Sequence, residues 1–160
     1  MQPADHAAVS ALLRACFDWL ADREGFSARQ RAFLVGPRSS EETLRAESRT
    51  RPHWVARGDD GTILGLVAVR ENEIARLYVH PAHHGMGVGK ALFAAAEALI
   101  REAGHRELTV AALVESAAAF YRARGMHETG RQPYEPQIFD DRDVVLLAKS
   151  LVDGDPSPPA

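Results

Sequence analysis

The hydrophobic pattern of this 160-residue chain changes its period several times, and each change predicts a new element. Between residues 5 and 21 the apolar positions recur at helical spacing, which predicts an amphipathic helix with Asp5 as its N-cap. These apolar positions are Val9, Leu12, Leu13, Cys16, Phe17 and Leu20. Weaker helical stretches follow at residues 27–34 and 40–49, and Gly36-Pro37 separates them.

Alternating apolar positions in the middle of the chain predict three strands. They cover residues 53–57, 62–70 and 73–79, with turns at residues 58–61 and at Asn72. Because short turns join them, we expect an antiparallel meander.

The second half of the chain predicts a β-α-β unit and three further elements. Helical spacing over residues 87–103 ends at Gly104, and a strand at residues 107–112 is expected to run parallel to the strand at 73–79. The remaining predicted elements are a helix at residues 115–124 and strands at residues 126–130 and 143–149. The pattern therefore predicts the α/β class, in a mixed α+β form.

Composition narrows the class of protein. The charged fraction of 26% and the hydrophobic fraction of 46% are ordinary for a globular protein. We expect one domain over residues 1–150 and a disordered tail at 151–160. A net charge of −3 without a basic block gives no reason to expect nucleic acid, and no apolar run is long enough to span a membrane. Cys16, the only cysteine, excludes an intramolecular disulfide and favours a cytoplasmic location.

The most informative segment is the turn between the strand at 73–79 and the helix at 87–103. Gly85, Gly87 and Gly89 alternate there. Glycines at a strand-to-helix turn let the backbone approach a ligand closely and aim its N–H groups outward. The first turn of the helix adds the positive end of its dipole. The segment therefore predicts an anion site, most simply one for pyrophosphate.

Two common nucleotide-binding loops fit this segment poorly. A Walker A loop requires glycine five residues before its Gly-Lys pair and Ser or Thr after it, whereas this chain has His84 and Ala91 there. A dinucleotide-binding loop requires its third glycine one residue later, and an acidic residue about twenty positions on. No acidic residue stands at Leu108 to Val110, where that side chain would be needed. A nucleotide-binding enzyme is therefore the weaker alternative.

The remaining pattern resembles motif A of the GNAT superfamily of N-acetyltransferases, (Arg/Gln)-x-x-Gly-x-(Gly/Ala). Here it reads His84-Gly85-Met86-Gly87-Val88-Gly89. A second landmark of the superfamily, A-x-x-F-Y-x-x-x-G-F, is similar to Ala117–Met126, and the two occur in the family's order. Two positions depart from the family pattern. His84 stands where Arg or Gln is usual, and Val114 where an Asn often contacts the cofactor.

The resemblance implies a GNAT-like fold, with a mixed central sheet, an antiparallel meander, a β-α-β cofactor-binding unit and flanking helices. It also implies acetyl-CoA as co-substrate and no metal. The loop amides would hold the pyrophosphate, pantetheine would run beside the preceding strand, and the Val79 N–H would meet the thioester carbonyl. The expected cofactor-binding residues are Leu77, Tyr78, Val79, His84, Gly85, Met86, Gly87, Val88, Gly89 and Lys90.

For chemistry, the resemblance implies transfer of an acetyl group to a primary amine by direct attack on the thioester. Tyr121 matches the family's tyrosine and is the expected acid for the leaving thiolate. Glu73 stands where some members carry a glutamate base, and it would accept the amine's proton directly or through water. A histidine, or water alone, is the alternative base.

Several further predictions concern neighbouring residues and partners. His80, His83 and His84 lack a further ligand class, so no metal site is predicted. Cys16 lies on an apolar helix face and is expected to be structural. The expected partner is a small-molecule amine of undetermined identity, and the resemblance also allows a homodimer. A non-catalytic acyl-CoA-binding or regulatory module is the alternative function.

Overall fold

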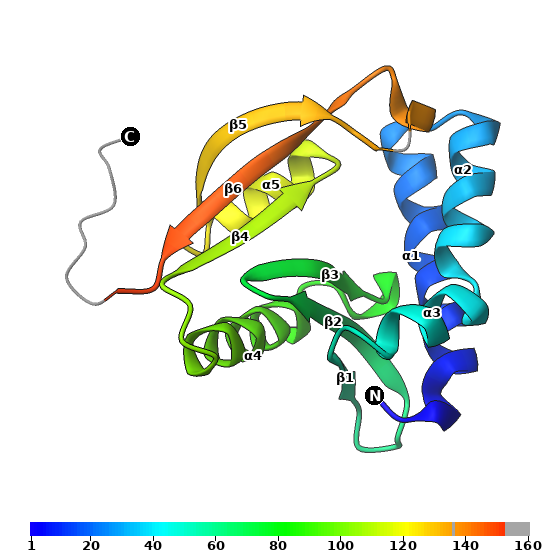
Figure 1. The fold of residues 1–160 in the computed structure, drawn as a ribbon. Coiled ribbons are helices and arrows are strands. Elements are labelled where there is room, and N and C mark those ends of the chain that lie inside the picture. The colour runs from blue at the N-terminus through cyan, green and yellow to red at the C-terminus, as the bar shows by residue number, and fades with distance from the viewer. Residues whose placement is uncertain (136, 153–160) are drawn as a thin grey trace. The chain divides into compact units, whose positions relative to one another are not determined.

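The computed structural model describes residues 1–135 and 137–152, and every helix and strand expected from the pattern is present there (Figure 1). The α-helices are α1 (His6–Glu24), α2 (Ala28–Val35), α3 (Glu41–Ser48), α4 (Val88–Glu102) and α5 (Glu115–Arg122). The strands are β1 (His53–Arg57), β2 (Ile63–Arg70), β3 (Glu73–Val79), β4 (Glu107–Ala112), β5 (His127–Pro133) and β6 (Asp143–Ser150). No helix within the described residues is both long and apolar enough to cross a membrane.

The strands form one mixed sheet of six strands in the order β1-β2-β3-β4-β6-β5. β1 and β2 pair antiparallel, and β3 and β4 pair parallel through Glu73 and Thr109, as the β-α-β prediction requires. β6 pairs antiparallel with both β4 and β5, so it lies between them in the sheet. The fold is therefore the expected mixed α/β arrangement.

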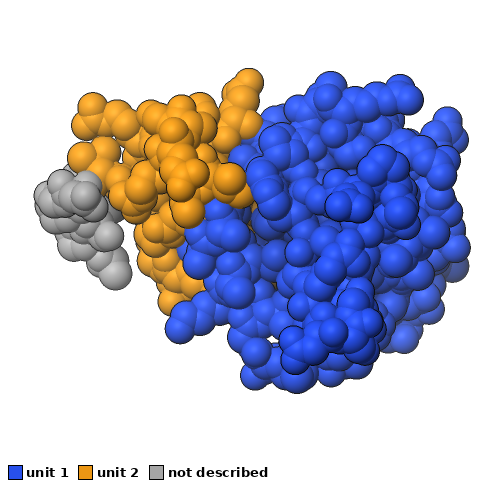
Figure 2. Space-filling model, turned by 90° about the horizontal axis from the view of Figure 1, so that it is seen from below, with its two compact units in different colours: residues 1–70, 76–96 blue, residues 71–75, 97–160 orange. Residues whose placement is uncertain are grey.

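The chain divides into two compact units, which Figure 2 shows in different colours. The first unit contains residues 1–70 and 76–96, and the second contains residues 71–75 and everything from residue 97 onward. The prediction of a single domain over residues 1–150 stays a prediction. Of the expected tail at 151–160, residues 153–160 lie outside the described part of the chain.

Local signals explain where the helices of the first unit begin and end. The Ser27 hydroxyl accepts the backbone N–H of Gln30 at 3.2 Å and starts α2, and the Ser40 hydroxyl accepts that of Thr43 at 3.1 Å and starts α3. Such N-caps satisfy helix donors that have no intrahelical acceptor. Gly25, with φ of 66°, ends α1 in the left-handed conformation that glycine adopts without strain.

Asp5 occupies the predicted N-cap position of α1, but its side chain makes no capping hydrogen bond to the helix. Its carboxylate instead accepts the backbone N–H of Gln2 at 2.7 Å and the Arg57 guanidinium at 2.6 Å. The Gln2 hydrogen bond and the Arg57 pair together lower the pKa of Asp5. A long-range ion pair has therefore replaced the local cap.

The core of each unit follows the predicted apolar faces. In the first unit α1 packs on β2, and Val9, Leu13 and Phe17 are buried together with Leu66 and Val67. In the second unit β4, β6 and α5 contribute many of the buried residues. They include Leu108, Val110, Ala118, Val145 and Leu147.

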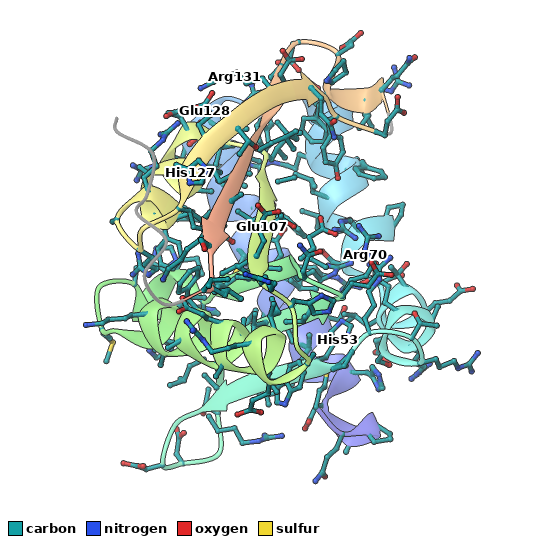
Figure 3. The ribbon with its side chains drawn as sticks, turned by 60° about the vertical axis from the view of Figure 1, so that its left-hand side comes forward. His53, Arg70, Glu107, His127, Glu128 and Arg131 are labelled. Carbon is teal, nitrogen blue, oxygen red and sulfur yellow. The ribbon has the colours of Figure 1, made fainter. Side chains whose placement is uncertain are left out.

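β5 is an edge strand, and charged side chains cover it. Figure 3 labels three of its residues, His127, Glu128 and Arg131. Arg131 pairs with Glu128 at 2.8 Å, and Glu128 also pairs with Arg122 of α5 at 2.6 Å. Charged edges of this kind discourage pairing with strands of other chains.

Candidate functional site

The glycine-rich turn lies where the sequence placed it, between the end of β3 and the start of α4. A short 3-10 helix (Pro81–His83) leads into it. Gly85 has φ of 75° and Gly87 has φ of 84°, and side-chain-bearing residues rarely adopt these backbone angles. A Cβ atom added to either glycine would meet no atom within 4 Å. The turn is therefore open as well as glycine-dependent.

The first turn of α4 supplies hydrogen-bond donors to this open space. The helical ladder begins with the Ala91 N–H, which donates to the Gly87 carbonyl at 3.0 Å. The N–H groups of Val88, Gly89 and Lys90 precede it and have no acceptor within the helix. Their partial positive charge, together with the exposed Lys90 side chain, suits an anion. The donor set fits a pyrophosphate group.

Hydrogen bonds fix the segment that leads from β3 into the glycine-rich turn. That turn, residues 85–90, is called the cradle below. The backbone N–H of His80 donates to the Leu64 carbonyl at 2.9 Å, and that of His83 donates to the His80 carbonyl at 2.8 Å. The His80 ring accepts the backbone N–H of Ala82 at 3.1 Å. Within the described residues no group of three or more His, Cys, Asp or Glu side chains is arranged to hold a metal ion.

His84 contacts the strand end with its ring. Its Nε2 donates to the Val79 carbonyl at 2.9 Å. The Cys16 thiol donates to the same carbonyl at 3.3 Å. Burial raises the pKa of Cys16 to about 12, so the thiol stays protonated and is not a nucleophile. The structural role expected of Cys16 is confirmed by this contact.

Gly65 of β2 lets the start of α4 pack closely on the sheet next to the cradle. The sequence did not predict this role for Gly65. A Cβ atom there would lie 2.8 Å from Leu92 Cδ1, 2.9 Å from the Tyr78 carbonyl oxygen and 3.3 Å from Val88 Cγ1. Only an unexplained glycine inside an apolar strand could have signalled this close approach.

We expect Gly65→Ala to lower the free energy of unfolding by about 1–3 kcal/mol, because the added methyl overpacks this contact. Displacement of the first turn of α4 should also weaken the CoA binding that the sequence predicts. Urea unfolding and calorimetry measure the two effects. Gly130→Ala is the matched control, since a Cβ atom at Gly130 would meet nothing within 4 Å. Equal stability of the two variants would contradict the close-packing argument.

A buried ion pair joins Arg76 of β3 to Glu47 of α3, and the sequence did not predict it. The Arg76 side chain is 0% exposed, and its Nε and one terminal nitrogen donate to the two Glu47 carboxylate oxygens at 2.8 and 3.1 Å. Arg38 and Arg51 also approach Glu47, at 3.1 and 3.6 Å. Burial raises the pKa of Glu47, but the hydrogen bond from Arg76 and the three guanidinium charges outweigh burial and lower it.

His53, labelled in Figure 3, borders this cluster at the start of β1. Its Nδ1 lies 2.7 Å from the Arg51 carbonyl, and its Nε2 lies 3.9 Å from Glu47. Burial lowers the pKa of His53, although the Arg51 carbonyl and the Glu47 charge oppose that effect. The neutral ring with hydrogen on Nδ1 is therefore favoured.

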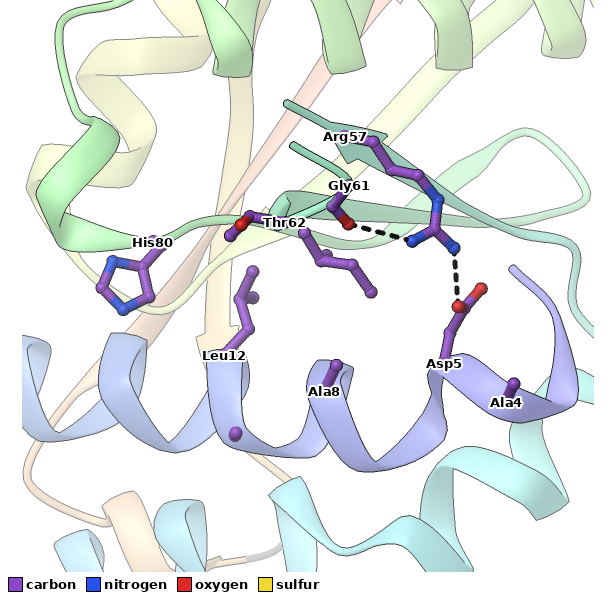
Figure 4. A pocket seen from close by; sticks show the side chains of 10 residues that line it. Ala4, Asp5, Ala8, Leu12, Arg57, Gly61, Thr62 and His80 are labelled. Atoms are coloured by element: carbon purple, nitrogen blue, oxygen red, sulfur yellow. Dashed lines mark hydrogen bonds and ion pairs between the residues drawn. The ribbon is translucent and has the colours of Figure 1, made fainter. Parts of the chain in front are cut away.

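A separate hollow of about 510 Å³ lies between the first half of α1 and the β1–β2 turn (Figure 4). Ala8, Leu12 and Ile63 give it apolar walls, and His80 lies at one end. The Asp5–Arg57 ion pair closes the other end, and Arg57 also donates to the Gly61 carbonyl at 3.3 Å. None of the predicted cofactor-binding or catalytic residues lines it.

The two predicted catalytic residues belong to the second unit, whereas the glycine cradle belongs to the first. Tyr121 is 6% exposed on α5, and its ring packs edge-on against Phe120 with 5.1 Å between centroids. Glu73 is half-buried and opens β3. Their roles in catalysis stay predictions.

The arginines in and around α3 form ion pairs. Arg38 and Arg51 pair with Glu47, and Arg45 pairs with Glu41 at 2.8 Å. In the loop before β6, the Tyr134 and Phe139 rings meet edge-on, with 5.1 Å between centroids. The ion pairs give these arginines a structural role.

Two comparisons of sequence agree with the site geometry. The model of the acetyltransferase (GNAT) family matches residues 13–126. An aminoglycoside N(6')-acetyltransferase type 1 from Stenotrophomonas maltophilia is 39% identical over 117 residues, which cover 72% of this chain and 68% of that protein.

Solved structures share the fold. A GCN5-related N-acetyltransferase from Rhodopseudomonas palustris aligns with a TM-score of 0.82 and 26% identity, covering 94% of this chain and 92% of the other. The paia N-acetyltransferase from Thermoplasma acidophilum, in complex with coenzyme A, aligns with a TM-score of 0.74 and 18% identity, over 94% and 95% of the two chains. The chain belongs to the acetyltransferase (GNAT) family and is an N-acetyltransferase, an enzyme of the acyltransferase class.

Proposed function

We propose that the protein transfers an acetyl group from acetyl-CoA to a primary amine of a small molecule. The observation that carries this proposal is the open glycine cradle at the start of α4, in which Gly85 and Gly87 have positive φ and the next three amides lack helical acceptors. Such a cradle suits the pyrophosphate of CoA. The similar fold of a protein in complex with coenzyme A supports the same cofactor.

In this proposal the thioester is held at the end of β3. Pantetheine runs beside Leu77–Val79, and the Val79 N–H donates to the thioester carbonyl. A fixed backbone donor at this position stabilises the negative charge that develops on the carbonyl oxygen during attack. Holding the amine near attack distance supplies much of the remaining acceleration.

The proposed reaction needs no covalent enzyme intermediate. The neutral amine nitrogen forms a bond to the carbonyl carbon, the carbon–sulfur bond breaks, and the Tyr121 hydroxyl gives its proton to the departing sulfur. The amine loses its proton to solvent water. Six residues of strand separate Glu73 from Val79, about 20 Å. A base must reach the proton directly or through one water, so this length favours water over Glu73 as the proton acceptor.

Tyr121→Phe should lower kcat by about 100-fold, within the range for loss of one general acid, and leave the affinity for acetyl-CoA unchanged. Steady-state rates and calorimetry separate these two quantities. A urea unfolding curve shows whether the variant keeps its fold. An unchanged kcat would remove Tyr121 from the mechanism.

We propose an aminoglycoside as the first acceptor to test. The relative from Stenotrophomonas maltophilia is an aminoglycoside N(6')-acetyltransferase, and it is 39% identical. The loop before β6 exposes Glu135, Asp140 and Asp141, which would attract a polycationic amine.

The proposed location is the cytoplasm. The buried, protonated Cys16 thiol and the use of acetyl-CoA support a cytoplasmic location.

The experiment is a thiol-release assay with acetyl-CoA and a panel of amines. The panel contains aminoglycosides with and without a 6'-amino group, linear polyamines and free amino acids. Release of CoA with the 6'-amino compounds supports the proposal, and release only with another class reassigns the acceptor. CoA binding without release for any amine would favour the non-catalytic acyl-CoA-binding module.

A further inference from the structure

We propose that His84 is a positioning residue that fixes the distance between the thioester-binding end of β3 and the pyrophosphate cradle. The inference rests on the proposed function, because it assigns His84 a task in holding acetyl-CoA. It also revises the role expected from the sequence, in which His84 was one of the residues that bind the cofactor directly.

The first argument is the position of the contact in the chain. His84 immediately precedes Gly85, and its Nε2 lies 2.9 Å from the carbonyl of Val79, five residues earlier and the last residue of β3. The side chain therefore joins the first position of the cradle to the end of the strand. Because acetyl-CoA must reach from the amides of the cradle to the Val79 N–H, this cross-link sets the span that the ligand has to bridge.

The second argument is that α1 supports the same link from its side. Cys16 and Trp19 lie three residues apart, so they share a face of the helix. The Cys16 thiol donates to the Val79 carbonyl at 3.3 Å. The Trp19 ring meets the His84 ring edge-on, with 4.8 Å between centroids, and Arg23 lies over Trp19 at 5.2 Å. One helix face thus holds both ends of the link.

The third argument concerns charge. A carbonyl oxygen only accepts hydrogen bonds, so Nε2 must carry the hydrogen in both the neutral and the protonated ring. The link therefore does not require a positive charge on His84. A direct contact between His84 and phosphate would gain from such a charge, because hydrogen bonds from an ionised donor are stronger. The two roles predict different effects of substitution on ligands with and without pantetheine.

The test compares three variants and two ligands by calorimetry. His84→Ala removes the link, His84→Gln keeps an N–H donor without charge, and His83→Ala is the matched control in the same loop. The ligands are CoA, which spans the cradle and the strand end, and 3′-phosphoadenosine 5′-diphosphate, which carries the pyrophosphate without pantetheine.

We expect His84→Ala to weaken CoA binding about five- to tenfold, as for the loss of one hydrogen bond. Binding of the shorter ligand should change less than twofold, by the same reasoning, because that ligand does not reach the strand end. His84→Gln and His83→Ala should bind CoA nearly as well as the wild type. Equal losses for the two ligands, or failure of His84→Gln to restore affinity, would overturn the positioning role.

A second readout does not depend on ligand. Nitrogen NMR of the wild-type imidazoles should show the neutral His84 ring with its hydrogen on Nε2, and Trp19→Leu should broaden or shift that signal. The Nδ1–H tautomer would overturn the inference. If wild-type protein binds no CoA but His84 shows the Nε2–H signal, the proposed function fails, and the positioning role for acetyl-CoA falls with it.

Discussion

Gly87→Glu is expected to abolish CoA binding, with a loss of affinity of about 100-fold or more, while the protein stays folded. Gly87 has φ of 84° and faces open space at the first turn of α4. A glutamate there would place a carboxylate among the amides proposed to hold pyrophosphate, so it would both fill the site and repel the ligand. Titration calorimetry with CoA measures the effect.

Gly61→Glu is the matched control for this variant. Gly61 has the same φ of 84°, and a Cβ atom there would also meet nothing within 4 Å. It lies in the β1–β2 turn, away from the cradle sequence. Both variants should therefore carry a similar cost in backbone strain, but only Gly87→Glu should lose CoA. Normal CoA affinity in Gly87→Glu would contradict the proposal that the cradle binds the pyrophosphate of CoA.

The second large effect is expected at the buried ion pair. Glu47→Ala should lower the free energy of unfolding by about 3–5 kcal/mol, because it leaves the guanidinium of Arg76 buried without its carboxylate. Arg76→Met should cost less, since Glu47 would keep Arg38 and Arg51 as partners. Urea unfolding at neutral pH measures both.

Two comparisons sharpen this prediction. Glu41→Ala, which removes an exposed pair with Arg45, should change stability by less than about 0.5 kcal/mol. The double variant Glu47→Leu/Arg76→Met should recover much of the loss, because apolar side chains of similar volume can replace a buried pair. A cost for Glu47→Ala no larger than that for Glu41→Ala would contradict a structural role for the cluster.

The same ion pair predicts a dependence on pH. The pKa of Glu47 lies below its ordinary value of about 4.5 in the folded protein, so the unfolded chain takes up the proton first as pH falls. The stabilisation is therefore present above that value and is lost at lower pH. The difference in stability between wild type and Glu47→Ala should narrow as the solution is acidified.

The elements of this fold were largely predictable because their signals are local. The period of apolar residues identified α1, and the alternation and short turns identified β1 to β3. The glycine turn was predictable for the same reason, since positive φ at Gly85 and Gly87 is a property of a few adjacent residues.

Features that depend on contacts between distant residues were not predictable. In the sequence Arg76 resembles any polar residue of a strand. Only its ion pair with Glu47, 29 residues away, explains why it is buried. Asp5 has the residue type of an N-cap, but Arg57 competes for its carboxylate from 52 residues away. The place of β6 between β4 and β5 likewise depends on pairing that no turn signal specifies.

The measurement that tests the central claim most directly is a thermal-shift comparison of the wild-type protein with acetyl-CoA, CoA, ATP and NAD. A ligand at a hundredfold excess over its dissociation constant stabilises the native state by about 2.7 kcal/mol. Acetyl-CoA and CoA should each raise Tm, and ATP and NAD should not. No shift with either CoA compound, or a shift with ATP or NAD alone, would contradict the assignment of the glycine turn as a CoA cradle.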